Sequence, residues 1–166
     1  ELERCEALGI DALVTHPGSA TDGDRQSGIE RNAYEVGIAL GEVPGTTRVL
    51  FEITAGAGNV LGSTFEELAR LIELLPAHVR GRAGVCFDTC HAYAAGYDLV
   101  NQYDHVRDEL DRIVRLGCIG LFHLNDSECT PGLRRDRHSN IGQRELGLEP
   151  IWRLLSAPPL LAGWHR

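Results

Sequence analysis

Two residue types are missing from this sequence. None of the 166 residues is Met or Lys, so all 16 basic residues are Arg. Because a translated chain starts with Met, we expect the sequence to be an internal segment of a longer protein, in which a signal peptide would go unseen. Long apolar runs are also missing, since none approaches the roughly 20 residues that a membrane-spanning helix needs. The sequence therefore predicts no membrane-spanning segment.

Cysteine, proline and glycine are too sparse for several classes of protein. The five cysteines, an odd number without a repeated spacing, do not predict a disulfide framework, and reduced thiols favour a cytoplasmic location. Seven prolines and 19 glycines are too few for a disordered or fibrous chain, so we expect one globular domain. The net charge of −8 argues against a polyanionic partner, unless acidic residues bind metal ions.

Hydrophobic periodicity alternates between the strand and the helix pattern along the chain. Short apolar or β-branched runs predict strands over 12–14, 48–53, 83–87 and 118–124. Helical periodicity predicts helices over 1–8, 28–41, 64–75, within 89–116 and over 148–155. Gly9 is placed to end the first helix, and Ser63 with Glu66 forms a capping box that starts the third. Strands separated by helices predict parallel βαβ units and hence an α/β fold.

Four polar side chains mark the carboxyl ends of the four predicted strands. The four are separated by 36, 36 and 35 residues, and they are His16, Glu52, Asp88 and His123. A repeat of this length is typical of a TIM (β/α)8 barrel, whose active site lies at the carboxyl ends of its strands. Four units make up half of such a barrel. We therefore expect residues 1–166 to form a partial barrel domain that lacks the first strands and the last one.

The side chains at these strand ends are of types that bind metal ions. His91 lies three residues after Asp88, and the long polar loop before the last helix adds Asp136 and His138. Imidazole and carboxylate ligands together favour zinc or a similar transition metal over magnesium or calcium. A single histidine at a strand end is more often structural, but four successive strand ends with ligand side chains favour a metal site. Glu52 is placed to bridge two cations.

Three carboxylates at one rim point to the same chemistry. Glu52, Asp88 and Asp136 would repel one another there without a metal ion, and one or more of their pKa values would rise. Divalent cations would remove that repulsion. Such cations also lower the pKa of bound water to about 7 and stabilise the oxygens of a phosphoryl group.

A glycine-rich loop over 54–62 carries a weaker signal. Gly56, Gly58 and Gly62 follow a strand and precede a helix, as in a dinucleotide-binding turn. The spacing is off by one residue, and Glu52 just upstream would repel a pyrophosphate. A tight turn beside the site is the preferred interpretation.

Two further groups of residues leave alternatives open. Cys86 and Cys90 have three residues between them, so they form no CxxC motif, and packing is the favoured role. Arg135, Arg137 and Arg144 lie in the polar loop over 125–145. Such arginines are usually solvated, but in a loop with Asp136 they can also hold the phosphates of a nucleic acid.

Five runs of the sequence resemble one known family. They are His16–Ser19 (HPGS), Glu52–Gly56 (EITAG), Gly84–Asp98 (GVCFDTCHAYAAGYD), Phe122–Ser127 (FHLNDS) and Asp136–Gly142 (DRHSNIG). In this order the runs resemble endonuclease IV, the zinc-dependent apurinic/apyrimidinic endonucleases of DNA base-excision repair. The resemblance covers about residues 8–155, and the third and fifth runs are highly specific.

The resemblance implies a TIM barrel with three zinc ions, with Mn²⁺ as an alternative for some of them. By the resemblance, His16 and Glu52 serve one zinc ion. Glu52, Asp88 and His123 serve the second, and His91, Asp136 and His138 serve the third. Glu52 and Asp88 are then the catalytic residues. The implied reaction is hydrolysis of double-stranded DNA on the 5′ side of an abasic site, which leaves a 3′-hydroxyl, by an enzyme that is monomeric when complete.

The sequence departs from the family pattern at several points. Ile53 stands where the family usually has Asn, and Arg144 stands where glycine is common. One family His ligand from an earlier strand and one Glu ligand from the last strand have no counterpart here, and the segment 157–166 offers no candidate for that Glu. Two other functions stay open, namely a sugar isomerase or epimerase of the xylose-isomerase-like barrels and an inactive metal-binding segment. Many such isomerases use Lys beside the metal ions, and this chain has none.

Overall fold

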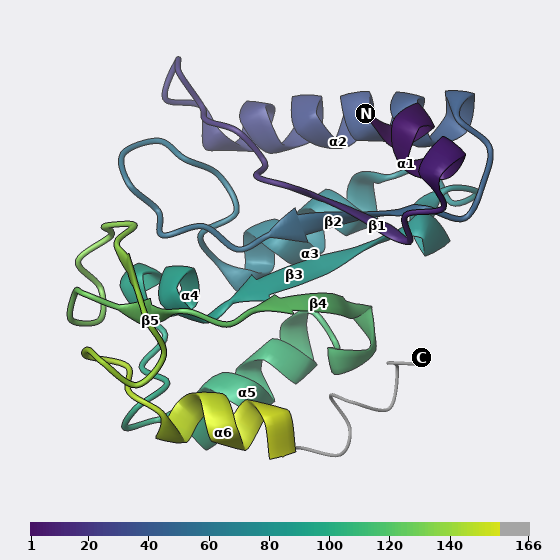
Figure 1. The fold of residues 1–166 in the computed structure, drawn as a ribbon. Helices are drawn as coiled ribbons and strands as arrows, with labels where there is room; N and C mark the ends of the chain where they lie inside the picture. The colour runs from purple at the N-terminus through teal and green to yellow at the C-terminus, as the bar shows by residue number, and fades with distance from the viewer. Residues whose placement is uncertain (157–166) are drawn as a thin grey trace.

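A computed structural model describes residues 1–156 (Figure 1). The segment 157–166, in which the sequence offers no candidate for the last Glu ligand, lies outside the described residues. The helices are α1 Leu2–Leu8, α2 Arg25–Glu42, α3 Phe65–Leu74, α4 Thr89–Ala95, α5 Tyr103–Ile113 and α6 Glu149–Ser156, with 3₁₀ turns at Arg80–Arg82 and Leu116–Cys118. The strands are β1 Ala12–Thr15, β2 Arg48–Glu52, β3 Ala83–Asp88, β4 Ile119–His123, β5 Asp126–Ser127 and β6 His138–Ser139.

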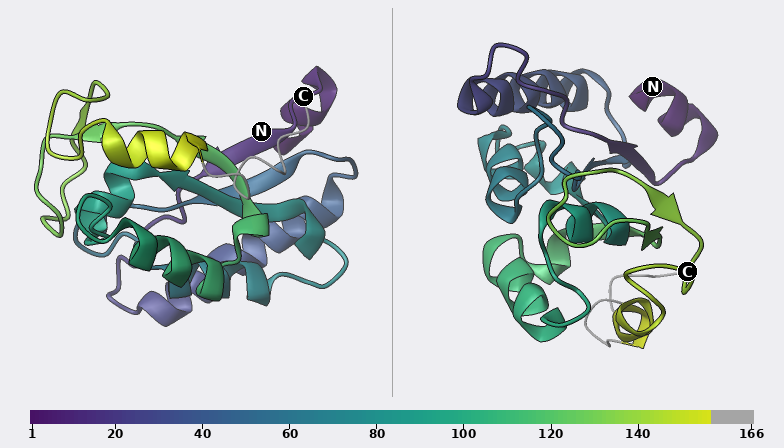
Figure 2. Two further views of the ribbon diagram at one scale, coloured as in Figure 1. Left: turned by 90° about the horizontal axis from the view of Figure 1, so that it is seen from below. Right: turned by 90° about the vertical axis from the view of Figure 1, so that its left-hand side faces the viewer.

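The first four strands form one parallel sheet. Their order is β1-β2-β3-β4, so neighbours in the sheet are neighbours in the chain, and each pair is joined by a helical crossover. Helices α2, α3 and α5 lie along one face of this sheet (Figure 2). The structure confirms the predicted α/β fold with four βα units, and each predicted strand matches the observed one to within a residue at either end.

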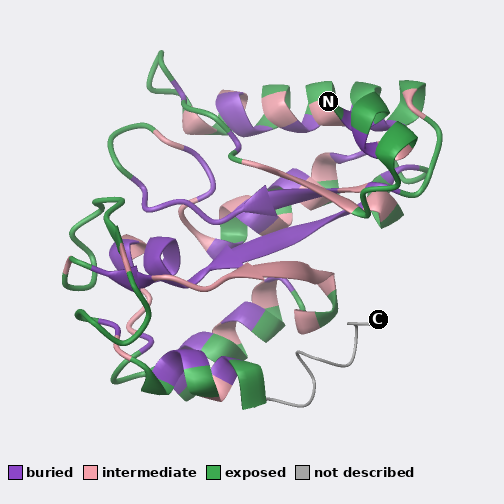
Figure 3. Cartoon of the chain, in the orientation of Figure 1, coloured by how far each residue is buried: buried purple, intermediate pink, exposed green. Residues whose placement is uncertain are grey.

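Side chains along the two central strands alternate between the faces of the sheet. Val49 and Phe51 on β2, with Val85 and Phe87 on β3, belong to the hydrophobic core that the helices cover. These four are at most 5% exposed, and both central strands are buried over most of their length (Figure 3). The alternate residues of the same strands face the opposite way, and Glu52 ends that series on β2.

Three details of the helices and loops differ from the prediction. Thr64, not Ser63, is the N-cap of α3, because its hydroxyl accepts a hydrogen bond from the N–H of Glu67 at 3.2 Å. The predicted capping box with Glu66 is therefore wrong by one residue. The helical segment within 89–116 is two helices, since Gly96 ends α4 at a φ of 121°. Inside the predicted polar loop over 125–145, β5 and β6 pair as a short antiparallel hairpin.

Other features of the fold agree with the sequence. Gly9 ends α1 in the left-handed conformation, as predicted. Helix α2 starts at Arg25, three residues before the predicted start, because the Asp24 side chain caps it by accepting from the N–H of Ser27 at 3.0 Å. Within residues 1–156, no helix is both long and apolar enough to cross a membrane.

Candidate metal centre

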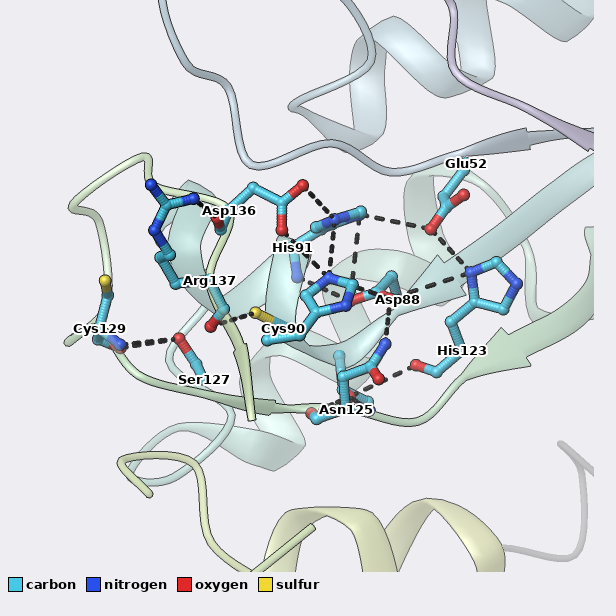
Figure 4. Close-up of polar contacts among 12 residues, drawn as sticks. Glu52, Asp88, Cys90, His91, His123, Asn125, Ser127, Cys129, Asp136 and Arg137 are labelled. Atoms are coloured by element: carbon cyan, nitrogen blue, oxygen red, sulfur yellow. Dashed lines mark hydrogen bonds and ion pairs between the residues drawn. The ribbon is translucent and has the colours of Figure 1, made fainter. Parts of the chain in front are cut away.

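The structure brings the predicted metal ligands together at one end of the sheet. His16 directly follows β1, and the last residues of the next three strands are Glu52, Asp88 and His123. His91 lies in the first turn of α4, His138 lies in β6, and Asp136 lies two residues before it. Figure 4 shows the side chains of Glu52, Asp88, His91, His123 and Asp136 converging from these elements. Side chains from six separate segments thus meet in one place.

Glu52 lies at the centre of this cluster. Its Oε1 is 2.8 Å from Nδ1 of His123 and 3.3 Å from Nδ1 of His91, and its Oε2 is 3.3 Å from Nε2 of His16. One carboxylate therefore contacts three imidazoles from three elements. This arrangement agrees with a carboxylate that serves more than one cation.

His91, Asp136 and His138 form a compact group of their own. Nε2 of His91 lies 3.2 Å from Oδ2 of Asp136 and 3.1 Å from Nε2 of His138, which in turn lies 3.1 Å from Oδ1 of Asp136. The three ligand atoms lie within 4.8 Å of one another, so one ion could contact all three. The grouping that the resemblance implies for these three residues agrees with this geometry.

The carbonyl of Ile53 orients the ring of His91. Nδ1 of His91 lies 2.9 Å from this oxygen. A carbonyl oxygen only accepts, so Nδ1 donates to it, which leaves Nε2, facing Asp136 and His138, as the nitrogen that could bind a metal ion. Histidine ligands are usually held in this way by a backbone carbonyl or a carboxylate. Because the backbone provides this contact, the replacement of the family's Asn by Ile53 leaves it in place.

Asp88 is fully buried and has a donor on each carboxylate oxygen. Oδ1 accepts from the backbone N–H of His91 at 2.8 Å, as an N-cap of α4, and Oδ2 accepts from Nδ2 of Asn125 at 2.7 Å. Oδ2 also lies 3.9 Å from Nδ1 of His123 and 3.9 Å from Nε2 of His138. Asp88 is therefore placed between the Glu52–His123 pair and the His91 group.

The electrostatics of the cluster favour a cation. Burial opposes ionisation of Glu52, but its hydrogen bonds with His91 and His123 and the charges of these rings lower its pKa to about 2. Burial alone would lower the pKa of His91, yet the hydrogen bond with Glu52 and the charges of Asp88 and Asp136 raise it to about 9. The pKa of Glu52 therefore falls, contrary to the rise expected of clustered carboxylates, because the facing imidazoles offset the repulsion. The raised pKa of His91 reflects the carboxylates around it, which favour a cation at this place.

Four residues at the site were not predicted to belong to it. The sulfur of Cys86 lies within 4.8 Å of ligand atoms of Glu52 and His123. The sulfur of Cys90 lies within 4.8 Å of ligand atoms of Asp88 and His138. Cys86 is the register partner of Glu52 in the sheet. It lies two residues before Asp88 on β3, so the two side chains share one face of the sheet, and this spacing could have predicted its place at the site. Asn125 and Thr89 are the other two. They lie beyond the strands and give no periodic signal.

Both thiols are buried and neutral. Burial raises the pKa of Cys90 to about 11, and burial also raises the pKa of Cys86. All five cysteines are free thiols. Packing, the role favoured for Cys86 and Cys90, agrees with their complete burial.

The glycine-rich loop forms one wall of the rim. Gly62 has a φ of 79°, and a Cβ there would lie 2.7 Å from Cγ of Pro17, so the tight-turn interpretation agrees with its conformation. Oε2 of Glu67 accepts from the N–H groups of Gly62 and Ser63 at 2.8 and 3.0 Å, and the same carboxylate pairs with Arg25. This contact ties the loop to the starts of α2 and α3.

The three predicted phosphate-binding arginines lie in the same part of the chain as Asp136 and His138. Arg135, Arg137 and Arg144 are all exposed in the loops around the β5–β6 hairpin. Nη1 of Arg137 donates to the backbone oxygen of Asp136 at 3.0 Å (Figure 4). The hairpin thus carries basic side chains next to ligand-type side chains, and none of the three arginines is used to neutralise Glu52 or Asp88.

The donor set fits a transition metal ion. Two imidazole nitrogens and one carboxylate oxygen converge in the His91 group, which matches the three protein ligands of a catalytic zinc site with a position left for water or substrate. The Nε2 atoms of His91 and His138 face each other at 3.1 Å, so both nitrogens are placed to reach one ion. The chain can therefore hold a metal ion at this site.

Comparisons with known proteins agree with the fold. A sequence model described as "Xylose isomerase-like TIM barrel" matches residues 1–164. Proteins named "Probable endonuclease 4" from Chloroflexus aggregans and from Geobacter sp. (strain M21) are 50% and 44% identical to the chain over 161 residues, and each match covers 95% of the chain and 56% of the relative. The chain thus spans about half the length of the curated relatives it matches.

A solved structure gives the same result in three dimensions. The crystal structure of endonuclease IV from Thermus thermophilus matches with a TM-score of 0.81 and 39% sequence identity, over 96% of this chain and 55% of that one. The predicted resemblance to endonuclease IV is thereby confirmed. Since the family model spans nearly the whole sequence, the chain belongs to the xylose isomerase-like TIM barrel family.

Proposed function

We propose that this chain forms the central part of a metal-dependent phosphodiester hydrolase that cleaves DNA on the 5′ side of abasic sites. The observation that carries the proposal is the convergence of seven ligand-type side chains at one end of the sheet, in a chain that is 50% identical to a protein named "Probable endonuclease 4". Barrel enzymes keep their active sites at this end of the strands.

Zinc is the proposed metal, with three ions per complete site and Mn²⁺ as an alternative for some of them. His16 and Glu52 would hold the first, Glu52, Asp88 and His123 the second, and His91, Asp136 and His138 the third. When bound, such ions activate water as a nucleophile and stabilise charge on phosphoryl oxygens. The third group supports the assignment best, because its three ligand atoms already converge.

The residues of the chain have distinct tasks in this proposal. Glu52 orients the rings of His16, His91 and His123, which it contacts at 3.3, 3.3 and 2.8 Å. Asp88 is held in a fully buried position by the two hydrogen bonds that its carboxylate oxygens accept. The side chains of Glu52 and His91 are 8% and 4% exposed, whereas His16 is half exposed and leaves the cluster accessible from its side.

The substrate in this proposal is double-stranded DNA that contains an abasic nucleotide. The exposed Arg135, Arg137 and Arg144 would bind phosphates beside the cleaved bond. A nucleotide without a base is the least costly to turn out of a duplex, because little stacking is lost. Bound cations would offset most of the net charge of −8 and so remove its repulsion of the DNA backbone.

Nicking of a defined duplex tests the proposal. The protein, with the sequence that flanks this chain, is incubated with a duplex that carries one abasic site and with the same duplex without it. We expect cleavage of the first duplex only, loss of cleavage after exhaustive chelation, and recovery on adding Zn²⁺. Cleavage that survives complete metal removal would contradict the proposal.

The same preparation separates the alternatives. Interconversion of keto and aldo sugars without cleavage of abasic DNA would favour an isomerase. Stoichiometric metal binding with neither activity would favour a metal-binding segment without catalysis. A His91→Ala variant is the matched control, because it removes one ligand of the best-formed group while leaving the strands of the sheet unaltered.

A further inference from the structure

We infer that Asn125 is a positioning residue that directs the Asp88 carboxylate toward the metal ions, and that Thr89 holds Asn125 in place. The inference deepens the proposed function and depends on it, because it concerns the second metal position of that same site. It begins from the 2.7 Å hydrogen bond from Nδ2 of Asn125 to Oδ2 of Asp88.

The hydroxyl group of Thr89 forms hydrogen bonds with both the N–H and the carbonyl of Asn125. Oγ1 of Thr89 accepts from the N–H of Asn125 at 2.9 Å and donates to its carbonyl at 2.6 Å. The Thr89 side chain is fully buried, and its hydroxyl also lies 3.4 Å from the carbonyl of His123. Thr89 thus connects the turn after β3 to the end of β4, where sheet pairing has stopped. The side chain of Asn125 leaves this fixed backbone toward Asp88 (Figure 4).

Two donors leave Asp88 with little choice of orientation. A carboxylate offers about four lone-pair positions in all. The N–H of His91 occupies one on Oδ1, and the Asn125 amide occupies one on Oδ2. The free position on Oδ2 lies on the side of His123 and His138, whose ring nitrogens are each 3.9 Å away. Asn125 therefore selects the direction in which Asp88 can bind a cation.

A neutral donor is the right group for this place. An arginine or lysine here would neutralise Asp88 and compete with the cation for its oxygens, whereas an amide orients the carboxylate and leaves its charge intact. The donor also satisfies one oxygen of a fully buried carboxyl group. Partners of this kind typically set metal affinity by roughly 10- to 100-fold.

The test measures the affinity of the protein for each zinc ion that it binds. The protein with its flanking sequence is titrated against a chromophoric chelator, as the wild type and as Asn125→Leu, which keeps the side-chain size and removes the donor. We expect one zinc equivalent to weaken by roughly 10- to 100-fold while the others stay unchanged. In an Asp88→Ala background, Asn125→Leu should have no further effect, because the carboxylate on which it acts is gone.

Substitutions of Thr89 and Asn101 complete the test. Thr89→Val removes the hydroxyl and should reproduce the selective loss, whereas Thr89→Ser keeps the hydroxyl and should restore wild-type affinity. Asn101→Leu is the matched control, because Nδ2 of Asn101 makes the same contact with Asp98, at 2.9 Å on the surface. This variant should bind zinc like the wild type.

Several outcomes would overturn the inference. These are unchanged binding in Asn125→Leu, an equal loss of every equivalent, or a loss that persists without Asp88. A wild type that binds no zinc would overturn it as well. A wild type that binds zinc but does not cleave abasic DNA would overturn the proposed function alone, since the affinity pattern of the variants would still decide the role of Asn125.

Discussion

Glu52 contacts ligand-type side chains from three separate elements of the fold. Its carboxylate contacts His16, His91 and His123, so Glu52→Gln removes the charge that holds them at nearly constant side-chain volume. We expect zinc affinity to fall by more than the roughly 10- to 100-fold typical of groups outside the ligand shell. Competition with a chelator measures the fall. Glu66→Gln, on the exposed face of α3, is the control, and equal zinc binding by both variants would contradict the role given to Glu52.

The carboxylate of Asp126, which is not one of the proposed metal ligands, is the basis of a second prediction. Its buried carboxylate accepts from the N–H groups of Ser127, Arg144, Leu146 and Gly147 at 2.7 to 3.3 Å. The hydrogen bonds tie the loop that carries Arg144 to the β5–β6 hairpin. Asp126→Asn should lower the free energy of unfolding at neutral pH by about 1–3 kcal/mol, because it turns an anionic acceptor into a partial donor.

The effect of Asp126→Asn on stability should depend on pH, in a direction that the pKa of Asp126 determines. Burial opposes ionisation of Asp126, but its backbone hydrogen bonds outweigh that effect and lower its pKa. A lowered pKa stabilises the folded state above the unfolded value of about 3.9, and the stabilisation is lost as the pH falls toward the folded value. Urea unfolding should therefore show a gap between wild type and Asp126→Asn at pH 7 that narrows below about pH 4. The exposed Asp11→Asn variant should show no gap, and a gap that widened in acid would contradict the assignment.

At the scale of elements, the Arg25–Glu67 contact joins α2, α3 and the glycine-rich loop. The two side chains approach to 2.6 Å and are 36% and 13% exposed. Glu67→Ala should cost more stability than Arg25→Ala, because it also leaves the N–H groups of Gly62 and Ser63 without their acceptor. We expect losses of about 1–3 and about 0.5–1 kcal/mol, measured by chemical denaturation.

An exposed pair provides the comparison for this prediction. Arg70 and Glu73 lie 3.6 Å apart on the surface of α3, and Arg70→Ala should change stability by no more than about 0.5 kcal/mol. Equal losses in Glu67→Ala and Arg25→Ala would mean that the backbone hydrogen bonds to Glu67 contribute no more than the bond of Arg25 to the carbonyl of Val60.

The elements also explain how far the sequence could predict the fold and the site. The four strands were predicted because buried strands give continuous apolar runs, and their near-constant spacing placed His16, Glu52, Asp88 and His123 at one rim. The β5–β6 hairpin was missed because strands of two residues have no measurable period. Asn125 was missed for a related reason, since its role comes from one hydrogen bond after the strand has ended.

The grouping of the ligands could not be predicted in full from residue types. The resemblance assigns His91 to the Asp136–His138 group alone, whereas Nδ1 of His91 also lies 3.3 Å from Oε1 of Glu52. No pattern in the sequence reports a contact between residues 39 positions apart on different elements. The carbonyl of Ile53, which fixes the ring, belongs to the backbone and is equally invisible in residue types.

At the scale of the whole molecule, the proposed binding of DNA by a chain with a net charge of −8 would require local positive charge. If Arg135 and Arg137 bind phosphates, replacing both with Ala should weaken binding to all duplexes and reduce the salt slope of log K by about 1 for each phosphate that is no longer bound. Fluorescence anisotropy at several salt concentrations, with chelated protein to prevent cleavage, measures both quantities. Arg112→Ala on α5 is the control, and an unchanged slope in the double variant would remove these arginines from the DNA interface.

The edges of the sheet predict how residues 1–166 behave when they are expressed alone. Within residues 1–156, β1 and β4 each pair with a neighbour along one edge only, and β4 is half-buried along its whole length. An unpaired edge offers a row of N–H and C=O groups to another chain. Residues 1–166 expressed alone should therefore self-associate as the concentration rises, whereas a protein whose flanking strands close the barrel should remain monomeric. Sedimentation equilibrium of both forms decides the matter. A monomeric short form at every concentration would mean that twist or side chains at these edges block pairing.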